Sequence, residues 1–251
     1  MRGCIAGRVA ACYPWRVVWV VALPFLFSVL ASGCREQIPT GPPATPVSLQ
    51  FMLHLNDYYS FDNWKLDPDG FRIPSSRFRT SWRVLDTGAV AIGYPGVAIV
   101  IDSTFARDAS GRDSLVGTSY RYFRTTSNGD VFEFGFVSKL LATRDTLVVD
   151  PRWDKLLSPS VMPNSLWIVE SGDSTVGTVY ARFLTARELV GTTVNGVASG
   201  VLAYHVEITG LNLTLSLWVS DSPSGFLRFR DDSNVPYNRI FQELTSLRTA
   251  R

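Results

Sequence analysis

The chain has few of the residues from which metal sites, disulfides and common hydrolase sites are built. Its 251 residues include only three cysteines and two histidines. His54 and His205 each lie on the polar face of an expected strand, and neither has a partner at the short spacing typical of metal ligands. Nucleophile elbows, phosphate-binding glycine-rich loops and dinucleotide fingerprints are also absent. We therefore predict that the protein is not an enzyme and uses no cofactor or metal.

Carboxylates are the remaining candidates for chemistry. Two short segments, 61–70 and 102–113, each contain three aspartates: Asp62, Asp67, Asp69, Asp102, Asp108 and Asp113. Either segment could offer oxygen ligands to Ca²⁺. Neither has the twelve-residue calcium-loop pattern, and Asp-Pro-Asp-Gly is favourable turn chemistry without a metal. We interpret both segments as turns, and an enzyme that works through carboxylates is the alternative.

A strong excess of charge is also missing. The 24 basic and 22 acidic side chains give a formal net charge of +2. Arg2, Arg8 and Arg16 precede Cys34 and no acidic residue does, so the remainder of the chain is close to neutral. Because nucleic-acid binding needs a clustered basic excess to neutralise phosphates, we expect no nucleic-acid partner.

The N-terminal segment has the three parts of an export signal. A basic stretch ends at Arg16, an apolar run covers 17–30, and small residues precede Cys34. The apolar run has 14 residues and contains Pro24. A membrane-spanning helix needs roughly 20 residues. We predict that residues 1–33 are a signal peptide that is removed.

The sequence LASGC at 30–34 resembles the lipobox of bacterial lipoproteins. The resemblance implies that the thiol of Cys34 is diacylglycerylated, that the signal is cut before it, and that the new amino group is acylated. Cys4 and Cys12 would leave with the signal, so Cys34 would be the only cysteine of the mature chain. The alternative is an ordinary secretory signal followed by an unmodified cysteine.

Residues 34–46 are expected to form the lipidated cysteine and a tether. Four prolines fall in the last eight residues of this stretch, and proline-rich segments stay extended. Arg35, rather than aspartate, after the cysteine resembles the outer-membrane sorting pattern of enteric bacteria. We expect a lipid-anchored protein of the bacterial cell envelope, on the outer membrane where the host has two, facing the periplasm or the cell surface.

From Val47 onward the dominant hydrophobic period is two, which is typical of strands with one buried face. The alternation is clearest at 47–55, 78–84, 131–137, 202–208 and 211–219. Asn128-Gly129 and Asn195-Gly196 separate such segments and favour hairpin turns. These patterns predict an all-β protein, with an antiparallel sheet curved into a half-barrel, barrel or sandwich and few short helices. We expect 47–251 to be a single domain, with 151–163 a long loop or, alternatively, a domain seam.

Two strands carry an excess of apolar side chains. We predict that they line a pocket for an apolar ligand, because a curved sheet with such a lining can enclose one. The proposed lining residues are Phe132, Phe134, Phe136, Leu213, Leu215 and Leu217. The alternative is that these side chains are the ordinary core.

Two segments near the C-terminus resemble the paired hairpins of LolA-like periplasmic carrier half-barrels. They are VNGVASGVLAYHV at 194–206 and LWVSDSPSGFLRF at 217–229. The resemblance implies an incomplete barrel that holds a lipid or an acylated peptide in its concave face. It assigns no ligand residue in this chain.

Two functions follow as hypotheses. The first is an envelope lipoprotein that binds a lipid or another apolar ligand. The second is a structural or assembly module that docks on another envelope protein through its sheet edges or through an arginine-bearing strand face. That face holds Arg77, Arg79 and Arg83, which cross-strand acidic partners could equally neutralise.

Overall fold

The computed structural model describes residues 47–48, 51–108, 110–138, 151–158, 160–170, 177–210, 213–220, 225–233 and 239–250. The predicted signal peptide, the predicted lipid attachment site Cys34 and the tether lie outside these residues. Residues 44–251 form one compact unit. In the described part of the chain, no helix is long and apolar enough to cross a bilayer.

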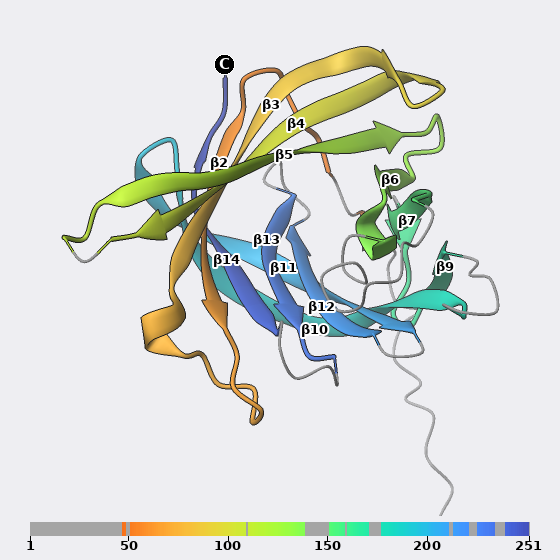
Figure 1. Ribbon diagram of the computed structural model, residues 1–251. Coiled ribbons are helices and arrows are strands. Elements are labelled where there is room, and N and C mark those ends of the chain that lie inside the picture. The colour runs from red at the N-terminus through yellow and green to blue at the C-terminus, as the bar shows by residue number, and fades with distance from the viewer. Residues whose placement is uncertain are drawn as a thin grey trace, which may run out of the picture. The chain divides into compact units, whose positions relative to one another are not determined.

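Strands make up most of this unit (Figure 1). They are β1 Val47–Ser48, β2 Tyr58–Lys65, β3 Phe78–Ala91, β4 Tyr94–Arg107, β5 Asp113–Thr125, β6 Val131–Phe134, β7 Trp153–Leu157, β8 Ser160–Val161, β9 Leu166–Glu170, β10 Val179–Val194, β11 Val197–Gly210, β12 Leu213–Ser220, β13 Phe226–Asp231 and β14 Ile240–Arg248. A short 3₁₀ helix, η1 Pro74–Ser76, follows β2.

Twelve of the strands form one sheet in the order β7-β6-β5-β4-β3-β2-β14-β13-β12-β11-β10-β9. The end of β10 also pairs with β14, in parallel, through Thr193 with Ser246 and Val194 with Leu247. This pairing closes β10 to β14 into a five-stranded barrel, and β2 to β7 extend the sheet beyond it. The prediction of an all-β, curved antiparallel sheet is confirmed.

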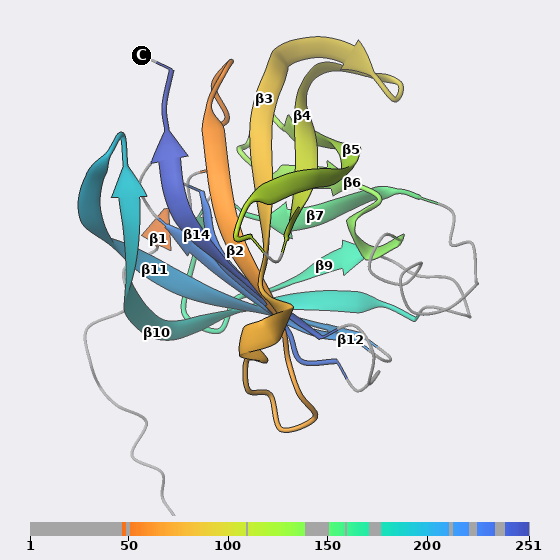
Figure 2. The same cartoon turned by 60° about the vertical axis from the view of Figure 1, so that its left-hand side comes forward.

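The two ends of the sheet come back to each other. Strands β7 and β9 lie side by side in both ribbon views (Figures 1 and 2). The indole Nε1 of Trp167 on β9 donates a hydrogen bond to the carbonyl oxygen of Lys155 on β7, at 3.2 Å. The sheet therefore wraps around an interior on one of its faces.

Both predicted hairpins are present. Gly129 has a φ of +87° in the turn between β5 and β6. Asn195 and Gly196 have φ values of 51° and 86°, and Val194 pairs directly with Val197. The second turn is therefore the two-residue hairpin that asparagine and glycine favour at positive φ. The first is longer, with five residues between the paired Thr125 and Val131, and only its glycine has a positive φ.

The predicted strand at 47–55 is wrong for most of its length. Of the described residues of this segment, Val47 and Ser48 are in a strand, where they pair with β8, and 51–55 are not. The chain turns before β2, where the buried carboxylate of Asp57 binds one backbone group nearby in sequence and one near the C-terminus. Its Oδ2 accepts a hydrogen bond from the backbone N–H of His54, at 3.0 Å, and its Oδ1 accepts one from Ala250, at 3.0 Å.

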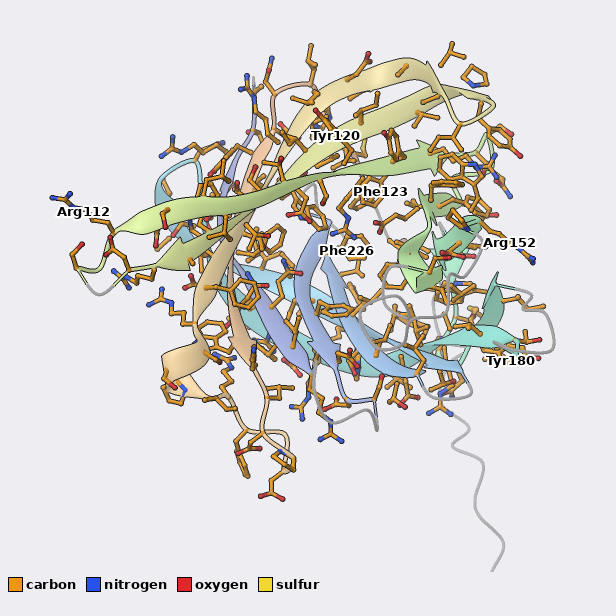
Figure 3. The ribbon with its side chains drawn as sticks, in the orientation of Figure 1. Arg112, Tyr120, Phe123, Arg152, Tyr180 and Phe226 are labelled. Carbon is orange, nitrogen blue, oxygen red and sulfur yellow. The ribbon has the colours of Figure 1, made fainter. Side chains whose placement is uncertain are left out.

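Aromatic side chains dominate the centre of the interior. Phe123 of β5 and Phe226 of β13 point into the space that the curved sheet encloses (Figure 3). Phe51 packs between them, with ring centroids 5.2 Å from Phe123 and 4.9 Å from Phe226. Residues from opposite ends of the chain thus share one core, which fixes the curvature of the sheet around the site described next.

Candidate functional site

The interior contains a cavity of about 270 Å³. Its walls come from β2 to β7 on one side and from β12 to β14 on the other, together with the segment after β6. The apolar lining residues are Phe61, Phe78, Trp82, Phe136, Leu156, Leu217, Phe226, Phe229 and Ile240. The polar lining residues are Asn63, Thr80, Asp102, Ser119, Arg121, Glu133, Arg228 and Gln242.

One row of residues across five strands forms much of the wall. Strand pairing places Leu217, Phe229, Gln242, Asn63 and Phe78 successively opposite one another, from β12 to β3. Because paired residues point to the same face of a sheet, these side chains all reach the cavity. Two amides therefore stand in the middle of an otherwise apolar row.

These two amides share one hydroxyl. The Nδ2 of Asn63 and the Nε2 of Gln242 both donate hydrogen bonds to the Oγ1 of Thr80, at 3.1 and 2.9 Å. Asn63 is only 3% exposed and Thr80 only 8%. We call Asn63, Thr80 and Gln242 the polar triad, and it is a fixed hydrogen-bonding surface within the cavity wall.

A buried ion pair forms a second polar part of the wall. The Nε and Nη2 of Arg121 donate to the two carboxylate oxygens of Glu133, at 2.7 and 2.6 Å. Asp102 lies farther away, with Oδ2 3.8 Å from Nη1 of Arg121. The guanidinium also lies over the ring of Trp82, 4.0 Å from its centroid.

The two carboxylates keep Arg121 charged. Burial alone would lower the pKa of Arg121, but the charge and hydrogen bonds of Glu133, with the charge of Asp102, outweigh burial and raise that pKa above its ordinary value. The bidentate geometry is the strongest form of this pairing. The guanidinium of Arg121 is therefore a cationic part of the wall, held by Glu133.

The predicted lining residues are divided between different places. Phe136 and Leu217 line the cavity. Leu213 and Leu215 are 3% and 0% exposed and belong to the packed core. All three leucines of β12 that were predicted to line the pocket therefore lie in the interior, but only Leu217 borders the cavity.

Phe132 and Phe134 lie on the other face of β6. Both are half-buried, whereas the alternate residues of β6, Val131 and Glu133, are buried. Phe132 stacks against the guanidinium of Arg124, 4.6 Å from its ring centroid, and Phe134 packs against Trp153. The expectation that these two phenylalanines face the interior is wrong, because β6 turns Glu133 inward to meet Arg121.

The prediction of turns is confirmed around Asp67 and Asp108, but it is wrong for Asp62, Asp102 and Asp113, which lie in strands β2, β4 and β5. Asp67 accepts the backbone N–H of Phe71 at 2.8 Å. The Oδ1 of Asp108 accepts the hydroxyl of Ser110, at 2.6 Å, and the backbone N–H of Arg112, at 2.9 Å. The Ser110 hydroxyl and then these backbone groups lower the pKa of Asp108 below its ordinary value. Within the described ranges, no three His, Cys, Asp or Glu side chains gather as a metal site.

The two histidines have structural surroundings. The Nδ1 of His54 lies 3.2 Å from the Oδ2 of Asp57. The ring of His205 stacks on Trp218, with centroids 4.6 Å apart and planes 3° from parallel. Neither lines the cavity.

Two of the three arginines on or beside β3 pair with acidic residues of other strands. Arg77, just before β3, pairs with Asp62 of β2 at 2.5 Å, and Arg79 pairs with Asp113 of β5 at 3.0 Å. Arg83 donates to the uncharged side-chain oxygen of Asn56, at 3.4 Å. Cross-strand neutralisation therefore accounts for Arg77 and Arg79.

Sequence reasoning missed the polar lining of the cavity. The one signal for it was the inward position of Asn63 and Gln242 on strands whose neighbouring inward residues are apolar. Amides at such positions must find hydrogen-bond partners or face a polar space. Nothing in the sequence indicated that Arg121 and Glu133 are inside. The alternation of apolar and polar residues in β6 predicted that its phenylalanines face inward, and therefore that Glu133 faces outward.

No family model and no curated protein matches the chain. Among solved structures, it is similar to one from Bacteroides fragilis that is provisionally described as an exported protein with a YmcC-like fold. The identity is 14%, the TM-score is 0.42, and the match covers 80% of this chain and 100% of that chain. A structure from Parabacteroides distasonis, provisionally described as a lipoprotein, matches with 12% identity and a TM-score of 0.39, over 80% of this chain and 99% of that chain.

Proposed function

We propose that this protein is a lipid-anchored, non-catalytic module of the bacterial envelope that binds one small apolar or amphipathic ligand in its interior cavity. The observation that carries the proposal is the cavity itself. Nine of its seventeen lining residues are apolar, and most of the polar ones are already paired with one another or with neighbouring groups. Small-molecule sites combine an apolar lining with polar groups that set orientation.

The size of the cavity limits the ligand. Its volume of about 270 Å³ lies just below the range typical of small-molecule sites, about 300–1,000 Å³. A single alkyl chain or a small ring system fits such a space, whereas a lipid with several acyl chains would leave most of its surface outside.

The anchor rests on the sequence. The lipobox-like segment before Cys34 and the absence of any later cysteine both support acylation at that thiol. The twelve residues of the tether would span about 37 Å if fully extended at about 3.1 Å per residue. That length is enough to hold the ligand-binding unit clear of a lipid surface.

The anchor has a simple test. Cells that produce the full chain are labelled with radioactive palmitate, and Cys34→Ala is compared with the unchanged chain. The variant should incorporate no label and should keep its signal peptide. Normal labelling of Cys34→Ala would overturn the anchor.

Ligand binding is tested by native mass spectrometry of the full chain before and after solvent extraction. A non-covalent ligand should be lost on extraction, whereas acyl groups on Cys34 should remain with the protein. Leu217→Trp, which fills the cavity, should be purified without the ligand. Leu166→Trp is the matched control, since Leu166 is 64% exposed on β9, and it should retain the ligand.

A second function is favoured by the edge strand β9. Leu166 and Ile168 are 64% and 50% exposed there, and exposed apolar edge strands are sites at which other chains can pair. An assembly module that docks through β9 would be purified with an empty cavity and would lose its protein partner when Ile168 is changed to lysine.

A further inference from the structure

The polar triad has unused hydrogen-bonding capacity. The hydroxyl of Thr80 already accepts two N–H groups, from Asn63 and Gln242. A hydroxyl has two acceptor lone pairs and one donor hydrogen. Both lone pairs are therefore occupied, and the hydrogen must be donated. No described residue accepts it, so the O–H of Thr80 is available to a molecule in the cavity.

The two amides leave acceptors beside this donor. Asn63 uses its Nδ2 for Thr80 and for the carbonyl oxygen of Phe61, at 3.1 and 3.3 Å. Within the described residues, neither the carbonyl oxygen of Asn63 nor that of Gln242 accepts a hydrogen bond. Asn63 as a whole is only 3% exposed, and both amides line the cavity. A hydrogen-bond donor in the cavity would therefore find these two carbonyl oxygens as acceptors.

The indole Nε1 of Trp82 has no hydrogen-bond partner among the described residues, but it is fully buried and is not presented to the cavity. The hydroxyl of Thr80 is therefore the donor in this part of the wall, and the two amide oxygens are the acceptors. A hydroxyl group matches this pattern, since it both donates and accepts.

The charged lining residues are already paired. Arg121 is held by Glu133, and Arg228 donates to Glu188 and Glu243, each at 2.7 Å. A carboxylate head group would lose its hydration in the cavity and would find both arginines engaged. An ammonium head group would lose its hydration too, and the two lining carboxylates already face Arg121: Glu133 binds it at 2.6 Å, and Asp102 lies 3.8 Å from it. Burying a charge without a free partner is strongly unfavourable, so the wall selects against ionised head groups.

We propose that the cavity recognises an amphiphile with an uncharged, hydroxyl-bearing head group, such as an alcohol or a polyol ester with a single alkyl chain. The head group binds the polar triad, and the chain packs against Phe61, Leu156, Leu217 and Phe226. This inference rests on the proposed function, because it names the ligand class of the same cavity.

The test compares three probes with the same chain length on the full protein: 1-decanol, decanoate and decylammonium. Affinity is measured by isothermal titration at neutral pH. We expect 1-decanol to bind at least about tenfold more tightly than either ion, since each ion forfeits charge hydration without a counter-charge.

Variants assign the preference to the triad. Asn63→Leu and Gln242→Met should each weaken the binding of 1-decanol about three- to tenfold, which is the effect of losing one uncharged hydrogen bond. Both variants should bind decanoate and decylammonium with the same affinity as the unchanged chain. Gln242 is half-buried, so Gln242→Met serves if Asn63→Leu does not fold. Thr118→Val is the control, because Thr118 is exposed on β5, and it should bind all three probes as the unchanged chain does.

The possible outcomes separate the two proposals. Binding of all three probes with equal affinity, or preferential binding of an ion, would overturn the head-group inference and leave the ligand-binding function standing. Unchanged preference for 1-decanol in both triad variants would overturn the role of the triad. No binding of any probe would overturn both proposals.

Discussion

Replacing Glu133 with glutamine should destabilise the protein more than any comparable change to a surface ion pair. Glu133 is fully buried, and the side chain of Arg121 is 16% exposed. The isosteric amide keeps the packing but removes the negative charge, so the guanidinium is left with much weaker compensation for its burial. Removing one partner of a buried pair costs about 3–5 kcal/mol, and the retained shape favours a value of about 3 kcal/mol.

This loss is large enough to measure. For a domain of this size, 1 kcal/mol lowers the Tm by about 2–4 °C, so Glu133→Gln should lower it by about 6–12 °C. Thermal and urea unfolding followed by circular dichroism would both show the change. In a double-mutant cycle with Arg121→Gln, the coupling free energy should be about 1–3 kcal/mol.

The control is an ion pair with similar chemistry in water. Arg182 and Glu207 are 3.4 Å apart across β10 and β11, and their side chains are 52% and 32% exposed. Glu207→Gln should cost no more than about 1 kcal/mol. If Glu133→Gln lowers the free energy of unfolding by no more than Glu207→Gln does, the buried pair of Glu133 and Arg121 contributes no more to stability than an exposed pair.

Three further predictions concern other parts of the sheet. Gly225→Ala should lower the free energy of unfolding by more than Gly93→Ala. Both glycines have a positive φ, so alanine is strained at either position. At Gly225 the added Cβ would also lie 2.6 Å from the ring of Phe51, whereas at Gly93 no atom lies within 4 Å of the added Cβ. Burial lowers the pKa of His205, although nearby carboxylates oppose the shift. The folded state therefore favours the neutral ring, and stability is lost as the pH falls below about 6.5. His205→Phe should lose less stability than the unchanged chain between about pH 7.5 and pH 5 in urea titrations, and an equal loss would contradict this. Trp167→Phe removes the hydrogen bond from β9 to β7 and should cost about 0.5–1.5 kcal/mol, with faster amide exchange in β9 as the second readout; unchanged exchange would count against that link.

The strands could be predicted because their residues alternate under local rules. The segments at 78–84, 202–208 and 211–219 all lie mainly within observed strands. The Asn-Gly pairs were equally local signals: at Asn195-Gly196 the two-residue hairpin has the positive φ at both positions that it requires. Strand β14 is completed by its neighbours β2 and β13, which supply its hydrogen bonds.

The closure of the barrel could not be predicted in this way. Thr193 and Ser246 are distant in sequence, and their parallel pairing depends on the accumulated twist of the intervening strands. The same twist decides which residues meet across the interior. No local pattern links Asn63 to Gln242, although the fold places them directly opposite each other.

The cavity was only partly predictable for a related reason. Alternation identifies two faces of a strand, and hydrophobicity selects the buried one when the contrast is clear. In β6 the contrast was misleading, because Glu133 is buried by its pairing with Arg121, a partner on another strand. Phe132 and Phe134 could then occupy the outer face, where Arg124 and Trp153 cover them.

Ligand binding in the interior is decided by a crystal structure of the full chain purified from its producing cells without added detergent. We expect continuous elongated density in the cavity, packed against Phe61 and Leu217, with its polar end within hydrogen-bonding distance of Asn63, Thr80 or Gln242. A cavity that holds only ordered water, or one closed by the side chains of its own walls, would show that the protein does not bind such a ligand.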